Sequence, residues 1–216
     1  MVDNTVRLRY TRPMETTNKA TNTETLGASR RPFLTTRDLC HIGIFAAIIA
    51  ILAQISIPMP LGVPITLQTF AILFAAIVLG AKKGTIATLV YVAVGAVGLP
   101  VFANFMGGMG VILGMTGGFL LSFPIMALLA GLGNEKSDNS DKKSAILWLI
   151  VGLVVGVAIN FLCGMLWFSM VTGSSISVSF VAAVLPFIPT SIVQIGIAAA
   201  FGRHVRKTLV KNKIIA

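Results

Sequence analysis

Charged side chains are scarce in this sequence, and three long stretches contain none. Only 11% of the 216 residues are charged, while 56% are hydrophobic. No Asp, Glu, Lys or Arg occurs in residues 39–81, 84–134 or 144–202. A soluble domain of this size could not bury so much apolar surface. The composition therefore predicts a membrane protein.

The missing charges also argue against several functions. An enzyme needs titratable groups at its reaction centre, and ion-coupled carriers keep a buried charge on their pathway. A phosphate-binding GxxxxGK[ST] motif is absent as well, because Lys83 precedes the second glycine of GAKKGT. We therefore expect neither catalysis nor self-powered transport, and any ATP must be hydrolysed by another chain.

Cysteine and histidine are equally rare, with two residues of each. Cys40 and Cys163 fall at or within apolar stretches, and His41 and His204 lie near charged clusters. This number and spacing fit neither a disulfide framework nor a metal site. We predict no metal and no cofactor.

The charges that are present give a net charge of +10 and form four clusters. These are the tail up to Asp38, Lys82–Lys83, Glu135–Lys143 and Arg203–Lys213. Each apolar stretch fits two spans of about 20 residues and a turn, so the chain returns to the same side at every cluster. Basic loops stay cytoplasmic, which puts both termini inside and explains the positive charge without a nucleic-acid partner.

The sequence thus predicts an all-α membrane protein with a six-transmembrane-helix bundle over residues 37–206. A disordered cytoplasmic tail (1–36) precedes it and a basic cytoplasmic C-terminus (207–216) follows. The expected helices are approximately 39–57, 67–80, 85–99, 110–132, 144–171 and 181–202. Residues 134–143 are expected to be a solvated linker, and 172–179 a polar outer loop.

Small residues at helical spacing indicate close helix packing. Gly110, Gly114 and Gly118 would share one face of the fourth helix, in a re-entrant wall that could border a pocket. Ala46, Ala50 and Ala53 would line one face of the first helix, and spacing alone favours a partner within the chain.

Uncharged polar residues in these apolar stretches are the candidates for ligand binding. The proline-rich segment 56–69 is expected to be extended and to act as a lid or binding loop. Buried polar groups must be satisfied inside the bundle, so hydrogen bonds between helices are the alternative to ligand binding for each of them. The candidates are Gln68, Tyr91, Asn104, Thr116, Gly117, Gly118, Asn160, Ser191 and Gln194.

Three segments carry a family resemblance when they are taken together: AQISIPMPLGVPITLQTFAILFAAIVLGAKKG, GAVGLPVFANFMGGMGVILGMTGGFLL and LPFIPTSIVQI. In this order they resemble the biotin-specific substrate-binding (S) component of energy-coupling-factor (ECF) transporters. The resemblance implies a six-helix protein of a prokaryotic cell membrane that captures a vitamin at the outer face. It also implies delivery to a transmembrane coupling subunit driven by two cytoplasmic ATPases, with the Ala46, Ala50 and Ala53 face contacting the coupling subunit.

The chain departs from this family's pattern where the ligand is bound. Ser191 and Gln194 stand where family members have Asp and Lys that contribute to biotin binding, and Phe119 replaces the tyrosine of TGGY. A carboxylate buried without a cation is costly. This departure argues against biotin, but the family's loop and glycine segments are retained, so we expect biotin or a close analogue. Lipoate, dethiobiotin, a neutral heterocycle or a non-transporting membrane scaffold remain as alternatives.

Overall fold

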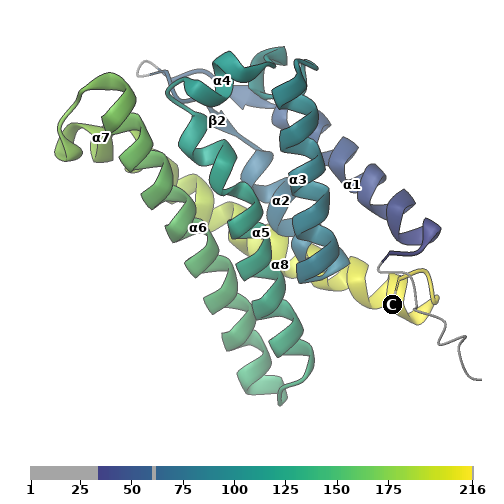
Figure 1. The fold of residues 1–216 in the computed structure, drawn as a ribbon. Coiled ribbons are helices and arrows are strands. Elements are labelled where there is room, and N and C mark those ends of the chain that lie inside the picture. Colours follow the sequence, from purple (N-terminus) through teal and green to yellow (C-terminus); the bar gives the residue numbers. More distant parts are fainter. Residues whose placement is uncertain (1–33, 60–61, 216) are drawn as a thin grey trace, which may run out of the picture. The chain divides into compact units, whose positions relative to one another are not determined.

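Helix α2 (Gln68–Leu79) lies at the centre of a helix bundle in the computed structural model, which describes residues 34–59 and 62–215 (Figure 1). Every residue from Ala71 to Leu79 is buried, as expected for a helix that is apolar on all sides. Around it pack α1 (Thr36–Ala53), α3 (Ala81–Val97), α5 (Gly117–Asp138) and α8 (Phe187–Lys211).

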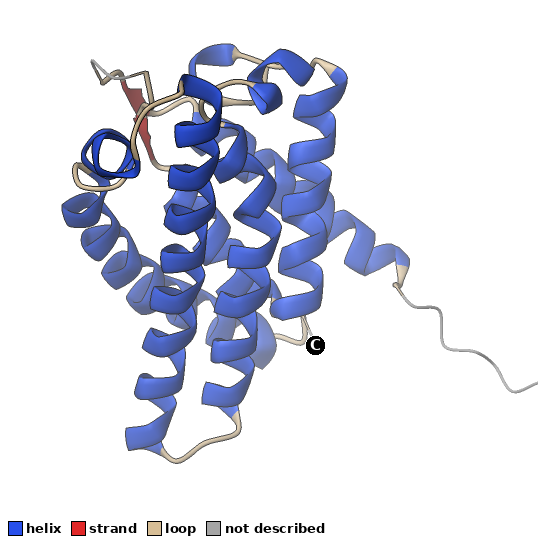
Figure 2. Cartoon of the chain, turned by 60° about the vertical axis from the view of Figure 1, so that its left-hand side comes forward, coloured by secondary structure: helices blue, strands red, loops and turns tan. Residues whose placement is uncertain are grey.

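The remaining elements complete the bundle and one of its ends. α6 (Lys142–Thr172) packs along α5, and the short α7 (Ile176–Ala183) follows it. Strands β1 (Ser56–Ile57) and β2 (Ile65–Thr66) form a small antiparallel hairpin, drawn in red in Figure 2. A 3-10 turn η1 (Ala103–Phe105) and the short helix α4 (Met109–Leu113) lie between α3 and α5. The fold is thus mostly helical, and the predicted extended conformation of the proline-rich segment is confirmed at β1 and β2.

Among the described residues, α1, α5 and α6 are each long and apolar enough to cross a bilayer. α7 and α8, which are bent by 48° at their junction, qualify together as a fourth span, and α2 is a shorter apolar helix. The outer surface of the spans is apolar, with exposed Leu147, Val154 and Leu162 on α6. Such a surface suits lipid rather than water.

The predicted charged clusters meet at one end of the bundle. Lys83 forms an ion pair of 2.6 Å with Asp38, and Arg206 forms one of 3.0 Å with Asp138. Glu135 accepts a hydrogen bond of 2.8 Å from the first N–H of α3. These contacts join all four clusters, which confirms that they share one side of the molecule. The hairpin and α4 lie at the other end (Figure 1).

Glycines allow α5 and α6 to approach closely. A Cβ on Gly152 would lie 2.7 Å from Cα of Gly133, and a Cβ on Gly156 would lie 2.9 Å from the carbonyl oxygen of Met126. Such distances leave no room for a side chain. Gly152 and Gly156 therefore form part of a face of α6 that packs directly against α5.

Several expected boundaries were wrong. The expected fourth helix is two helices, because the backbone of Gly114 is extended and breaks the chain between α4 and α5. Gly110, Gly114 and Gly118 therefore do not share a face, and only Gly118 packs tightly, against Trp167. The first helix ends at Ala53, before the hairpin.

The expected loops at the ends of α5 and α6 also differ. Helix α5 extends to Asp138 and α6 begins at Lys142, so most of the expected solvated linker is helical. The polar segment after α6 contains the first half of α7, and the basic C-terminal segment continues α8 to Lys211. The tail prediction falls mainly on residues 1–33, outside the described residues.

The alanine stripe of α1 faces inward. Ala46 and Ala53 are buried in the core and Ala50 is half-buried, because α1 packs on α2 and α3. The internal partner that the spacing favoured is present, and Ala46 and Ala53 offer no exposed surface to another protein. This corrects the interface that the resemblance implied for them. The small residues on the exposed face of α1 are Gly43 and Ala47.

Candidate functional site

A pocket lies at the end of the bundle opposite the charged clusters. The β-hairpin, the N-terminus of α2, the turn around η1, α4, the first turns of α5, the middle of α6 and the start of α8 contribute its walls. The lining residues are Val63, Pro64, Ile65, Thr66, Gln68, Thr69, Phe102, Ala103, Met106, Val111, Thr116, Phe119, Leu120, Phe123, Asn160, Phe161, Phe187, Thr190, Ser191 and Gln194. Apolar and aromatic side chains dominate, which is usual for a site that binds a small molecule.

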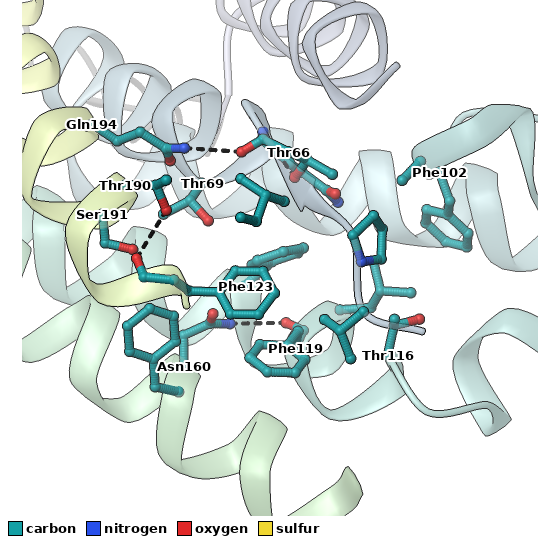
Figure 3. A pocket seen from close by; sticks show the side chains of 18 of the residues that line it. Thr66, Thr69, Phe102, Thr116, Phe119, Phe123, Asn160, Thr190, Ser191 and Gln194 are labelled. Carbon is teal, nitrogen blue, oxygen red and sulfur yellow. Dashed lines mark hydrogen bonds between the residues drawn. The ribbon is translucent and has the colours of Figure 1, made fainter. Parts of the chain in front are cut away.

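Gln194 fastens the hairpin to α8. Its side-chain nitrogen donates a hydrogen bond of 2.9 Å to the carbonyl oxygen of Thr66 in β2 (Figure 3). Its side-chain oxygen accepts one of 3.1 Å from the backbone N–H of Phe70, in the first turn of α2. The N-cap of α2 is Leu67, which has no capping side chain. Gln194 thus caps α2 from another helix and uses both ends of its amide on backbone groups.

Gln68 is held from behind the pocket by a chain of hydrogen bonds. Its nitrogen donates to the hydroxyl of Tyr91 at 2.7 Å, and that hydroxyl donates to the carbonyl oxygen of Val101 at 3.2 Å. Tyr91 is buried and does not line the pocket. Its predicted role in binding is therefore replaced by a positioning role.

Asn160 crosses from α6 to α5 and is 1% exposed. Its nitrogen donates to the carbonyl oxygen of Phe119 at 2.9 Å (Figure 3). It also donates to the hydroxyl of Ser122 at 2.8 Å. A carbonyl can only accept, so the nitrogen must face α5 and the oxygen is left toward the pocket. The nitrogen of Asn160 therefore joins α6 to α5, and its oxygen remains free to accept a hydrogen bond from a ligand.

The turn that carries Phe102 and Met106 is held in a strained conformation. Asn104 and Phe105 have φ angles of 58° and 55°, in the left-handed region that few non-glycine residues adopt. Gln54 accepts a hydrogen bond of 2.8 Å from the N–H of Phe105 and fixes this turn. The Asn104 side chain accepts a hydrogen bond from Ser56 and does not line the pocket, contrary to its predicted role.

The described residues that line the pocket include no Asp, Glu, Lys, Arg or His. The described part of the chain holds no group of three or more His, Cys, Asp and Glu that could bind a metal. The site can therefore bind a ligand through hydrogen bonds and apolar contact, and it offers no ion pair.

Comparison with known proteins identifies the family. The profile of the BioY family matches residues 20–211. The chain belongs to the BioY family. A biotin transporter BioY of Thermotoga maritima is 38% identical over 179 residues, which cover 82% of this chain and 99% of the relative. A probable biotin transporter BioY of Pyrococcus horikoshii is 36% identical over 170 residues, which cover 79% of this chain and 96% of the relative.

A solved structure supports the assignment to the BioY family. The crystal structure of the S-component for biotin from an ECF-type ABC transporter superposes with a TM-score of 0.71 and 30% sequence identity. The match covers 79% of this chain and 91% of that chain. The BioY family is a family of transporter components, and the chain is a membrane transport protein and not an enzyme.

In this BioY-family chain, the structure brings six of the predicted ligand-binding residues to one pocket. They are Gln68, Thr116, Phe119, Asn160, Ser191 and Gln194. Gly117 and Gly118 do not line it. A Cβ on Gly117 would collide with the carbonyl of Ile112, and one on Gly118 with Trp167, so these glycines serve packing.

Sequence reasoning missed the aromatic wall, formed by Phe102, Phe123, Phe161 and Phe187. One signal was present, because Phe119 and Phe123 stand four residues apart and share a helix face. Phe187 stands only a few residues before Ser191 on α8, which is a second signal. Phe102 and Phe161 carry no comparable pattern.

Proposed function

We propose that this chain is the vitamin-binding S component of an ECF-type transporter, and that it captures biotin or a close analogue at the outer face of a prokaryotic cell membrane. The single observation that carries the proposal is the pocket itself. Aromatic side chains and uncharged hydrogen-bonding groups from six separate segments enclose one site, at the end opposite the charged clusters. Membership of the BioY family supports biotin as the ligand.

The proposal includes a topology of six transmembrane helices: α1, α2, α3, α5, α6 and α8. α2 has only 12 residues, about 18 Å at 1.5 Å per residue, less than a bilayer core. The surrounding helices bury it from Ala71 to Leu79, so it need not match the lipid thickness. Both termini are assigned to the cytoplasm, because the basic clusters gather at their end.

Delivery of the ligand requires partners in this proposal. A transmembrane coupling subunit and two cytoplasmic ATPases would drive release, since no described residue within the apolar stretches offers an energy-coupling charge. We place the contact with the coupling subunit on the exposed face of α1. A Cβ on Gly43 would meet nothing within 4 Å, so another helix can approach closely there.

Binding is tested by calorimetry on the purified full chain with biotin, lipoate and dethiobiotin. We expect biotin to bind at micromolar concentration or below. Absence of heat up to high micromolar biotin would exclude it as the ligand. A membrane scaffold would bind none of the three, and Asn160→Ala would then change stability alone.

Orientation is tested by labelling single cysteines in intact cells, after replacing Cys40 and Cys163. An impermeant maleimide should label Pro58→Cys directly and Lys213→Cys only after permeabilisation; both side chains are exposed. The reverse pattern would invert the proposed topology. Proteoliposomes that contain this chain alone should bind biotin without accumulating it.

A further inference from the structure

We propose that the pocket selects an uncharged ligand that donates N–H hydrogen bonds, and that a ligand carboxylate gains no ion pair in it. This inference rests on the proposed function and narrows it. It predicts that a biotin-like molecule is recognised through its ureido group. The charge on its acyl tail would then add nothing to affinity.

The amide nitrogens of the site are used to different extents by the protein. Asn160 donates to Phe119 and Ser122, Gln68 donates to Tyr91, and Gln194 donates to the carbonyl of Thr66. A side-chain amide has two N–H groups, so Asn160 has used both and can only accept from a ligand. Gln68 and Gln194 each keep one N–H group, which suits a ligand carbonyl.

Acceptor oxygens, in contrast, remain available. The oxygens of Asn160 and Gln68 accept no hydrogen bond from the described residues. They are not among the enclosed unpaired atoms, which within that part of the chain are His41 Nδ1 and Asn134 Oδ1. Both amides line the pocket, so their oxygens are accessible from it; Figure 3 shows this for Asn160.

Three hydroxyl groups add to these acceptors. Thr69, Thr116 and Ser191 line the pocket, and their side chains make no hydrogen bond within the described residues. A hydroxyl can accept an N–H bond as readily as it donates one. The polar surface of the pocket therefore matches a cyclic urea, lactam or amide, whose N–H groups need acceptors.

Nothing in the wall compensates a negative charge. The basic residues of the described chain belong to the clusters at the opposite end, where Lys83 pairs with Asp38 and Arg206 with Asp138. The rest of the wall is apolar, with five phenylalanines among the lining residues. A carboxylate that entered would lose its water without gaining a cation. A bound acid must therefore keep its carboxylate in solvent, or its burial makes the binding free energy less favourable.

The test compares four ligands on the unmodified chain by calorimetry at pH 7: biotin, biotin amide, biotin methyl ester and a biotin methylated at a ureido nitrogen. We expect the amide and ester to bind at least as tightly as the acid, within threefold. We expect the N-methylated compound to bind at least tenfold more weakly than biotin, because it lacks one donor.

The possible results separate the two proposals. If the acid binds more than threefold tighter than both neutral derivatives, the inference is wrong and biotin capture stands. If N-methylation costs less than tenfold, recognition through N–H donors is wrong. If none of the four binds, the proposed function fails together with the inference.

A pair of serine variants checks that the pocket hydroxyls act on the ligand. Ser191→Ala should weaken the acid and the amide by the same factor, three- to tenfold. Ser179→Ala is the matched control, because Ser179 is also buried but lies on α7 outside the pocket. Weakening of the acid alone by Ser191→Ala would show that Ser191 holds the carboxylate and would contradict the inference.

Discussion

Replacing Gln194 by Leu should loosen the lid of the pocket without disturbing the bundle. Leu has a similar size but cannot bond to Thr66 or Phe70, the two backbone partners of Gln194. The substitution therefore removes the only side-chain bond that caps α2 at Phe70. It also removes the link between α8 and β2.

The expected magnitude follows from the groups left behind. The N–H of Phe70 belongs to the first turn of α2 and has no partner inside its helix. A buried donor or acceptor without a partner costs about 1–3 kcal/mol. Thr66 borders the pocket, where water can replace part of the loss, so we expect about 2 kcal/mol in total. This corresponds to roughly a 30-fold rise in the population of the opened lid.

Hydrogen exchange measured by mass spectrometry gives a direct readout. Peptides that span residues 62–70 should exchange about 30-fold faster in Gln194→Leu, and peptides from α5 and α6 should not change. Ile192→Ala is the control, because Ile192 is exposed on the same helix and lines no part of the pocket. If exchange in the hairpin peptides stayed within threefold of the unmodified chain, Gln194 would not be what holds the hairpin and α2 in place.

Three further substitutions test the fold by thermal unfolding in detergent. Gly152→Ala should destabilise the protein by about 2 kcal/mol, because the added methyl group would overpack against α5. Gly43→Ala should stabilise it by about 0.5–1 kcal/mol, because nothing lies near its Cβ. Shifts of the same sign in the two variants would contradict the close contact between α5 and α6. Phe105→Gly should stabilise by about 0.5–1 kcal/mol, because it relieves a left-handed residue whose side chain is 71% exposed; a loss of stability would mean that the ring packs. Arg206→Met should cost about 2 kcal/mol, since Arg206 donates to the C-terminal carbonyl of Val78 at 2.9 Å, and no change would show that water caps α2 equally well.

The helices could be predicted because charge marks their ends, but the break before α5 could not. Gly110, Gly114 and Gly118 fit one helix by spacing, and the local sequence gives no reason to interrupt it. The reason lies on another helix. Trp167 of α6 donates a hydrogen bond of 2.9 Å to the carbonyl of Gly114, and the backbone of Gly117 passes close to that of Ile112. These tertiary contacts stabilise a turn that sequence periodicity conceals.

The site was predictable to the extent that a polar residue in an apolar stretch must have a partner. That reasoning found Asn160, Ser191 and Gln194, which all reach the pocket. It also selected Tyr91 and Asn104, whose partners are Gln68 and Ser56 of the chain itself. Spacing cannot distinguish a group that binds a ligand from one that supports its neighbour.

The chemistry of the ligand depends on that distinction at the level of single atoms. Asn160 and Gln194 carry the same amide, and the sequence assigns them equal roles. Gln194 forms hydrogen bonds to the backbone through both its nitrogen and its oxygen, whereas Asn160 bonds to the protein only through its nitrogen. The first residue closes the site and the second offers an acceptor to it. Because Asn160 has used both N–H groups and presents only its oxygen, the pocket is suited to a ligand with N–H groups, whatever the charge of the ligand's tail.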